Sequence, residues 1–264
     1  MQEKQFRSFD KGMVPVFQNN ISGTAKGALR RMLVMEDLLQ IKELAGSDKP
    51  FKILDVGCGE GFFSAYFAGK GHNVVLCDVS EEMIAGVKKS FAENNLSPQA
   101  CFYCASMFDL PRILTGEKFD LILCHALLEW IGDQQHCLKI LSSFLTAGGY
   151  LSLLYYNRDA LYFHSLLMGN FSYIDCDFHS RHKQKMTPDF PVSPNQVNQW
   201  LQNENLTICR ETGIRVFRDY MRDKRHWTQL EEDILRYEQQ VSRDPRFMHL
   251  GRYIHVLAKN SRQD

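Results

Sequence analysis

The chain has 264 residues, and its 31 lysines and arginines are balanced by 31 aspartates and glutamates. With 44% hydrophobic, 23% charged and 12% aromatic residues, the composition is that of a folded globular protein and excludes a disordered chain. No apolar run is long enough to cross a bilayer, and residues 1–6 lack the basic and apolar regions of a signal peptide, so we expect a cytoplasmic protein.

The first predicted elements lead from a helix into a strand and a glycine-rich turn. Thr24 is a suitable cap for a helix whose apolar residues recur at helical spacing and that ends near Gly46. Residues 51–57 and 73–78 read as buried strands, and Ser80 can cap the helix that follows. Strand-like runs return at 100–105, 119–125 and 149–156, separated by helical stretches. This alternation predicts an α/β fold, a Rossmann-like, doubly wound and mostly parallel sheet with helices on both faces.

After residue 156 the alternation becomes irregular. The pattern predicts helices at 158–169 and 194–203, strands near 206–214 and 251–258, and a helix-rich insertion at 218–242. We interpret residues 1–264 as one domain, comprising an N-terminal helical cap (1–48), a cofactor-binding core (50–156), substrate-binding insertions with the rest of the sheet (157–250) and a closing strand (251–258). Insertions placed there overhang the carboxyl ends of a parallel sheet, where ligands bind in such folds.

The charge is unevenly distributed along these segments. Residues 1–31 hold six basic and two acidic residues, residues 32–178 ten and eighteen, and residues 179–225 nine and five. An acidic core therefore carries two basic segments. Charge alone leaves two interpretations open: surface charges that cluster by chance, or a basic rim for an anionic partner such as nucleic acid.

The eight cysteines give little reason to expect a metal. Most of them lie inside apolar runs, which is typical of reduced, buried thiols. Cys101 and Cys104 form a CxxC pair, but on a strand an odd spacing points the two sulfurs to opposite faces, and no second pair completes a zinc site.

The strongest motif is the turn after the first predicted strand. Residues 55–61, DVGCGEG, follow a strand and open a helix, and Asp78 ends the next strand, 21 residues beyond Gly57. The glycines permit a close backbone approach to a ligand, and an acid at the second position can accept hydrogen bonds from the ribose hydroxyls of an adenosine. Strand, turn, helix and acid together indicate a nucleotide-type cofactor.

On these residues the sequence resembles the class I S-adenosylmethionine-dependent methyltransferases. Residues 54–61 look like motif I of that family, residues 119–130 (FDLILCHALLEW) like its fourth-strand motif, and residues 145–151 (LTAGGYL) like the turn into its fifth strand. Ala147 stands where proline is common in the family. The resemblance implies S-adenosylmethionine as the cofactor. The cofactor-binding residues that it implies are Arg30, Asp55, Gly57, Cys58, Gly59, Asp78, Ser106 and His125.

A narrower resemblance covers nearly the whole chain. Residues 23–30 (GTAKGALR), 169–171 (GNF), 212–217 (TGIRVF) and 250–256 (LGRYIHV) look like the bacterial tRNA 5-carboxymethoxyuridine methyltransferases. The resemblance implies methyl transfer to the carboxylate of that modified uridine at the tRNA wobble position. In that case the carboxylate attacks directly, because a carboxyl group with an ordinary pKa of ~4 is already ionised. We therefore expect a clamp rather than a general base, with candidates Tyr156, Asn157, Arg215, Arg252 and Tyr253.

The basic segment near the C-terminus would then contact the anticodon stem and loop of tRNA. We expect its cations to bind phosphates and the interleaved Phe217, Tyr220 and His226 to stack on bases. The cations are Arg181, Lys183, Lys185, Arg215, Arg218, Arg222, Lys224 and Arg225. Two alternatives remain: a methyltransferase of a small organic acid or quinone precursor, and a non-catalytic RNA-binding or interaction module.

Overall fold

The computed structural model describes residues 24–46, 49–179 and 188–262. In this part of the chain seven strands form one sheet in the order β3-β2-β1-β4-β5-β7-β6. β1 to β5 pair in parallel, and β7 lies antiparallel between β5 and β6. The predicted Rossmann-like, doubly wound sheet is therefore confirmed. The strands are β1 (Lys52–Val56), β2 (Asn73–Asp78), β3 (Ala100–Cys104), β4 (Phe119–His125), β5 (Leu145–Tyr156), β6 (Leu206–Ile214) and β7 (Tyr253–Asn260).

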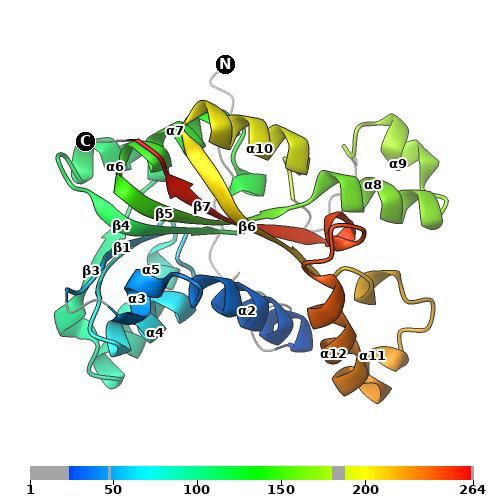
Figure 1. Ribbon diagram of the computed structural model, residues 1–264, viewed down its shortest axis with the longest axis horizontal. Helices are drawn as coiled ribbons and strands as arrows, with labels where there is room; N and C mark the ends of the chain where they lie inside the picture. The colour runs from blue at the N-terminus through cyan, green and yellow to red at the C-terminus, as the bar shows by residue number, and fades with distance from the viewer. Residues whose placement is uncertain (1–23, 47–48, 180–187, 263–264) are drawn as a thin grey trace.

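Helices cover both faces of the sheet (Figure 1). Successive strand residues point to opposite faces, so Ile53 packs under one layer and its neighbour Leu54 under the other. One layer contains α2 (Ala25–Leu38), α3 (Lys42–Gly46), α4 (Phe62–Gly69) and α5 (Glu81–Glu93). The opposite layer contains α6 (Leu110–Ile113), α7 (Gln134–Ser143) and α10 (Pro194–Asn203).

Both predicted helix caps are present. The hydroxyl of Thr24 accepts the N–H of Gly27 at 3.2 Å, and that of Ser80 accepts the N–H of Met83 at 3.3 Å. The first helix, however, ends at Leu38 and not near Gly46. Leu38, Ile41 and Leu44 still pack into the same apolar cluster, so the break between the two helices keeps these residues on the buried face.

The prediction that most cysteines are buried is wrong. Only Cys77, Cys124 and Cys137 are buried, Cys58 is intermediate, and four cysteines are exposed. Cys101 and Cys104 lie on β3, an edge strand whose outer residues are accessible to solvent although the local sequence is apolar. Within the described ranges, no group of three or more His, Cys, Asp or Glu side chains is placed to hold a metal ion.

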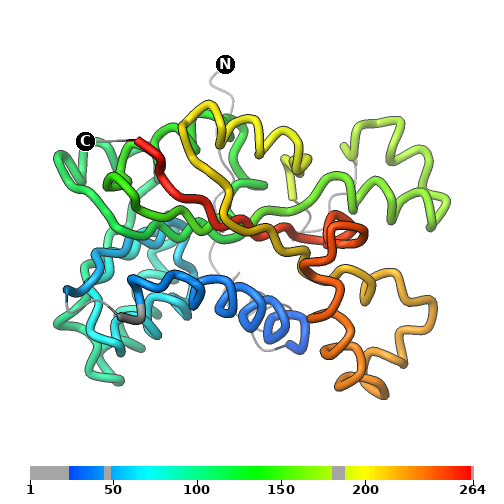
Figure 2. The backbone as a smooth tube through the Cα atoms, viewed as in Figure 1, coloured from blue at the N-terminus to red at the C-terminus, as the bar shows by residue number. Residues whose placement is uncertain are grey.

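The C-terminal half adds helices beside the carboxyl ends of the strands. α8 (Arg158–Leu167) and α9 (Phe171–Asp175) follow β5, and α11 (His226–Gln229) and α12 (Glu231–Val241) lie between β6 and β7. Figure 2 shows α12 beside α2, which is far away in the sequence. Gln239 donates to Glu36 at 2.9 Å across this contact. Among the described helices, none combines the length and apolar character required to traverse a membrane.

Two glycines bring β6 and the start of β7 unusually close together. A Cβ on Gly251 would lie 2.7 Å from the Cα of Gly213, and a Cβ on Gly213 would lie 2.1 Å from the carbonyl oxygen of Met248. Neither side chain could be accommodated without moving backbone. The approach places Arg215 and Arg252 side by side, where the N–H of Arg252 donates to the carbonyl oxygen of Arg215 at 3.3 Å.

Candidate active site

A pocket of about 590 Å³ opens at the carboxyl ends of the parallel strands. This volume lies in the range of small-molecule and cofactor sites. The pocket collects residues from β1, β2, β4 and β5, from the first turns of α2 and from the junction of β6 and β7. Every cofactor-binding residue predicted from the sequence lines it: Arg30, Asp55, Gly57, Cys58, Gly59, Asp78, Ser106 and His125.

The glycine-rich turn and Asp78 form one unit. The carboxylate of Asp78 accepts the N–H of Gly59 at 3.0 Å and the N–H of Ser80 at 2.9 Å. Gly61 has a φ of +66°, and a Cβ there would lie 2.5 Å from Val87, so only glycine lets the turn enter α4. Gly59 has a φ of +52° and open space where a Cβ would be. The turn therefore exposes bare backbone to a ligand, as a cofactor cradle requires.

Two carboxyl groups at this end of the pocket are deeply buried. Burial raises the pKa of Asp55 to about 7, although a 2.6 Å hydrogen bond from Ser64 opposes the shift. Burial also raises the pKa of Asp78, and its backbone hydrogen bonds only partly compensate. A cationic ligand beside them would favour their ionised forms. Cys58 is not activated, because burial raises the pKa of its thiol well above the ordinary value.

His125 ends β4 at the pocket wall. Its ring packs edge to face on Phe63, with 4.9 Å between the ring centres. Burial, followed by the proximity of His255 and of Arg30, lowers the pKa of His125 well below its ordinary value. The imidazole is therefore neutral near pH 7, and it adds no positive charge to this part of the pocket. Ser106 also lines the pocket, and its hydroxyl accepts the N–H of Phe108 at 3.3 Å.

The other end of the pocket is built from arginines and tyrosines. Arg252 lies over the ring of Tyr156 at 5.2 Å from the ring centre, and Arg215 lies 5.6 Å from the ring centre of Tyr253. The two tyrosine rings pack edge to face at 5.3 Å. Arg30 approaches the same Tyr253 ring at 5.7 Å. Four of the five predicted clamp residues therefore meet here, together with an arginine predicted for the cofactor.

The guanidinium groups in this part have unused hydrogen-bond donors. Nη2 of Arg215 pairs with Asp219 at 2.7 Å, and Nε of Arg252 lies 3.9 Å from the same carboxylate. Nε of Arg215 and both Nε and Nη1 of Arg252 are buried and have no hydrogen-bond partner among the described residues. Buried donors without partners are costly unless a ligand satisfies them. A planar anion such as a carboxylate matches donors of this kind.

Asn157 has a different role from the one predicted. Its side-chain amide donates to the carbonyl oxygens of His249 and Gly251 at 2.8 and 2.9 Å, and its oxygen accepts the N–H of Asp159. The side chain is fully buried and does not line the pocket. It caps α8 and fixes the strand junction that carries Arg252, so the amide has no capacity left for an acceptor.

Glu129 also lines the pocket, although it was not among the predicted site residues. It is 1% exposed, and its Oε2 has no hydrogen-bond partner among the described residues. Burial raises its pKa to about 7, and Arg30 is one of the groups that oppose the shift. The available signal was an acidic residue within the apolar fourth-strand motif, HALLEW.

Only some of the cations predicted to bind RNA are exposed among the described residues. Arg222, Lys224 and Arg225 are exposed next to α11. Arg218, by contrast, is buried over the ring of Trp227 at 4.3 Å, so the prediction that it lies on the surface is wrong. The side chain of Tyr220 is fixed within the protein, because its hydroxyl donates to the carbonyl oxygen of Leu250 at 2.8 Å. Arg181, Lys183 and Lys185 lie outside the described residues.

Comparisons with known proteins agree with this geometry. Residues 47–232 match a family model described as "Methyltransferase domain". The tRNA 5-carboxymethoxyuridine methyltransferase of Escherichia coli K12 is 38% identical over 97% of this chain and 97% of its own length. A ubiquinone biosynthesis O-methyltransferase of Coxiella burnetii is 29% identical over 61% of this chain and 66% of its own length. Among solved structures, the magnesium protoporphyrin IX methyltransferase of Synechocystis PCC 6803 with bound SAH has a TM-score of 0.60 at 16% identity, covering 96% of this chain and 100% of that one.

Proposed function

This chain belongs to the family of the tRNA 5-carboxymethoxyuridine methyltransferases, and we propose that it methylates the carboxylate of 5-carboxymethoxyuridine at the tRNA wobble position. The observation that carries the proposal is the group of buried, unpartnered guanidinium N–H groups on Arg215 and Arg252 beside the cofactor half of the pocket. A neutral acceptor would leave these donors unsatisfied, whereas a carboxylate would satisfy them.

S-adenosylmethionine is the cofactor, and it supplies a methyl group on a sulfonium. The residues present fit it, because the bare turn at Gly57 and Gly59 leaves room for the ligand and Asp78 ends the strand at which a ribose is bound in folds of this kind. We assign Asp55 to the cationic part of the cofactor, and Ser106 to the adenine. Arg30 is placed between the two halves of the pocket, next to Tyr253, and is our candidate for the methionyl carboxylate.

On the acceptor side the residues position the carboxylate and exclude water, without removing a proton. The pKa values of Tyr156 and Tyr253 are raised by burial, so both hydroxyls stay protonated and act as donors. Asp219 already shares the positive charge of Arg215 and Arg252. This sharing limits how strongly the clamp stabilises the acceptor in the ground state, which matters because excessive ground-state stabilisation raises the barrier.

For the tRNA we propose that the exposed cations near α11 contact phosphates. Arg222 and Lys224 are on the surface of the same insertion that carries the half-buried Asp219. A phosphate contact there would bring the nucleic acid up to the arginine end of the pocket. The proposal places the anticodon stem-loop as the partner, and a cytoplasmic location follows from that substrate.

The alternative of a small organic acid or quinone precursor is less well supported. The ubiquinone biosynthesis relative matches only part of this chain, whereas the tRNA-modifying relatives match nearly all of it, including both arginine-bearing segments at the C-terminus. The non-catalytic alternative fails because the chain is a member of an enzyme family and keeps an intact cofactor cradle.

The test is a competition between acceptors. Purified protein is incubated with methyl-labelled S-adenosylmethionine, tRNA from cells that lack this protein, and a mixture of small carboxylic acids and catechols. We expect the label in the tRNA, in a nucleoside whose mass and alkaline lability are those of the methyl ester. Label in the small molecules alone, or label in tRNA at an alkali-stable position, would contradict the proposal.

A further inference from the structure

A chain of four polar side chains crosses the buried interior from α2 to the pocket. Oδ2 of Asp37 lies 2.7 Å from Nδ1 of His255, whose Nε2 lies 2.8 Å from Oγ of Ser152. The same Oγ lies 2.8 Å from Nε2 of His125. Asp37, Ser152 and His255 are completely buried. Buried polar groups are costly to fold unless they are hydrogen-bonded, and each of these four lies within hydrogen-bond distance of the next.

The register of the sheet explains how these four side chains come together. His125 of β4 and His255 of β7 both pair with Leu154 of β5, one on each side. Ser152 is two residues earlier on β5 and therefore points to the same face as Leu154. The centres of the two imidazole rings lie 5.9 Å apart, and the hydroxyl of Ser152 lies within hydrogen-bond distance of both. α2 covers this face and supplies Asp37.

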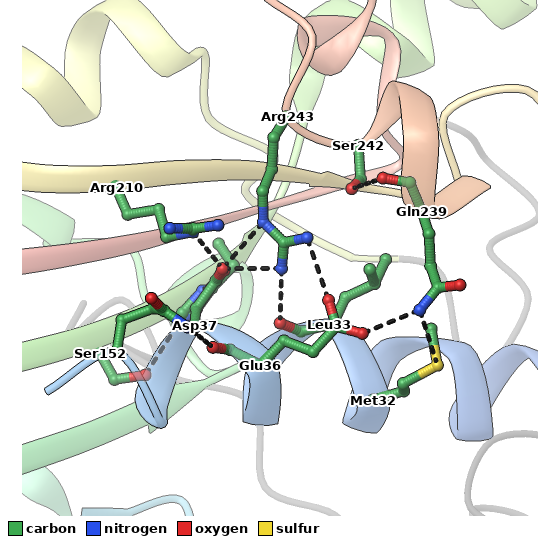
Figure 3. A network of polar contacts seen from close by, with 11 residues as sticks. Met32, Leu33, Glu36, Asp37, Ser152, Arg210, Gln239, Ser242 and Arg243 are labelled. Atoms are coloured by element: carbon green, nitrogen blue, oxygen red, sulfur yellow. Dashed lines mark hydrogen bonds and ion pairs between the residues drawn. The ribbon is translucent and has the colours of Figure 1, made fainter. Parts of the chain in front are cut away.

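The surrounding charges determine the direction of the hydrogen bonds. Oδ1 of Asp37 pairs with Arg210 at 2.7 Å and with Arg243 at 2.8 Å, and Arg243 also pairs with Glu36 at 3.0 Å (Figure 3). Two carboxylates and two guanidiniums are therefore balanced. Because the carboxylate of Asp37 is already paired with two guanidiniums, the arrangement that fits has Nδ1 of His255 donating to Asp37 and Nε2 of His255 accepting the Ser152 hydroxyl.

The directions of the remaining hydrogen bonds between these side chains then follow. The Ser152 hydroxyl has given its proton to His255, so its oxygen must accept at the other side, and Nε2 of His125 must carry the proton. The remaining nitrogen of His125, Nδ1, is then a lone-pair acceptor. Nε2 of His125 is engaged by Ser152 and the residue lines the pocket, so Nδ1 is the ring nitrogen left for a ligand.

We propose that Asp37, His255 and Ser152 are positioning residues that hold His125 in the Nε2–H tautomer, so that it presents a neutral lone pair to the cationic cofactor. Such a lone pair favours a bound cation or its N–H and C–H donors, whereas an N–H in the same place would repel them. The inference concerns only the cofactor half of the pocket, so it does not depend on the acceptor proposed above.

The first test is the tautomer itself in the wild-type protein. Nitrogen NMR of ¹⁵N-histidine-labelled protein distinguishes a protonated ring nitrogen from a bare one, and a His125→Asn sample assigns the His125 signals. We expect a protonated Nε2 and a bare Nδ1, with and without S-adenosylhomocysteine. A protonated Nδ1, or a doubly protonated ring near pH 7, would overturn the proposal whatever the variants do.

The second test breaks the row of hydrogen bonds from Asp37 to His125, which we call the relay. It compares the effect with that of losing a buried hydroxyl elsewhere in the protein. Ser152→Ala removes the bridging hydroxyl, and Ser142→Ala removes another buried hydroxyl, one that donates to Glu204 on α10's side of the sheet. We expect Ser152→Ala to give a mixture of His125 tautomers and to weaken S-adenosylhomocysteine binding about tenfold, the effect of one hydrogen bond. Ser142→Ala should change neither. Equal effects of the two variants, or an unchanged tautomer in Ser152→Ala, would contradict the relay.

Discussion

The carboxylate of Asp219 lies 2.7 Å from Nη2 of Arg215, and this ion pair fixes the guanidinium at the arginine and tyrosine end of the pocket. Arg215 itself has a φ of +60°, in the left-handed region that non-glycine residues rarely adopt. Strain of this kind is tolerated where the surrounding structure imposes it, and it clusters at functional sites. Here the backbone turn and the ion pair together aim the side chain at the pocket.

Removing an arginine of the clamp should slow the reaction more than it weakens cofactor binding. Arg215→Ala and Arg252→Ala each delete charge-assisted hydrogen bonds to the acceptor, which contribute about 1.5–3 kcal/mol and correspond to roughly a 10- to 100-fold loss of turnover. Single-turnover kinetics with tRNA and calorimetry with S-adenosylhomocysteine measure the two effects. Arg246→Ala, at an exposed arginine paired with Asp244, is the control. Full activity with normal cofactor affinity in both clamp variants would refute the clamp.

Cofactor affinity should depend on pH through Asp55. Its pKa in the free protein is about 7, and a cationic cofactor favours the ionised form. Below pH 7 binding must therefore release a proton, so the affinity falls as pH decreases from 8 to 6, by at most about tenfold per pH unit. Above pH 8 the affinity is constant.

Two neutral isosteres identify the carboxyl group responsible. Asp55→Asn should remove the pH dependence of S-adenosylmethionine affinity and weaken binding at pH 8. Glu129→Gln, which neutralises the other pocket carboxyl with a pKa of about 7, should leave the dependence in place. If calorimetry shows an unchanged pH profile in Asp55→Asn, the assignment of Asp55 to the cationic part of the cofactor is wrong.

The affinity for tRNA should fall steeply with salt. Each phosphate contact contributes a slope of about 0.7–0.9 to the plot of log affinity against log salt concentration. Arg222→Ala or Lys224→Ala should therefore reduce the slope by about 1. Arg112→Ala, on α6 at the opposite end of the molecule, is the control (Figure 1). A salt-independent affinity, or a slope that all three variants leave unchanged, would remove the proposed RNA surface.

A glycine-to-alanine substitution should have opposite effects at two sites. One is Gly251, in the close approach between β6 and β7, and the other is Gly86, on α5. Gly251→Ala forces a Cβ to within 2.7 Å of Gly213 and should destabilise the fold by about 1–3 kcal/mol, as overpacking does. Gly86→Ala lies on the exposed side of α5 with open space for a Cβ and should stabilise it by about 0.5–1 kcal/mol. Chemical denaturation measures both. A stable Gly251→Ala protein would show that the close approach is not required.

Local patterns were sufficient for the cofactor half of the site. The strand, the glycine turn, the helix and Asp78 are contiguous or nearly so, and the sheet places the carboxyl ends of successive strands at one edge. The sequence therefore predicted which residues would meet. The long apolar run around Leu38 and Leu39, in contrast, contained no signal that separated one bent helix pair from a single helix, because both keep the same residues on the buried face.

Contacts between distant segments were not accessible in the same way. Asp37 and His255 are 218 positions apart, and nothing in either local pattern connects them. The only signal was polar side chains within apolar runs, as for Ser152 in LSLLYY. Charge patterns were also ambiguous: Arg218 belongs to a basic segment but is buried over Trp227, because sequence charge does not reveal which cations face solvent.

The most direct test of the central claim is nucleoside mass spectrometry of tRNA from a strain that lacks this protein and is complemented with the wild type or with Asp78→Ala. The account predicts that the methyl ester of 5-carboxymethoxyuridine is lost in the deletion strain, that the free acid accumulates in its place, and that only the wild type restores the ester. An unchanged ester level without the protein, or full restoration by Asp78→Ala, would contradict it.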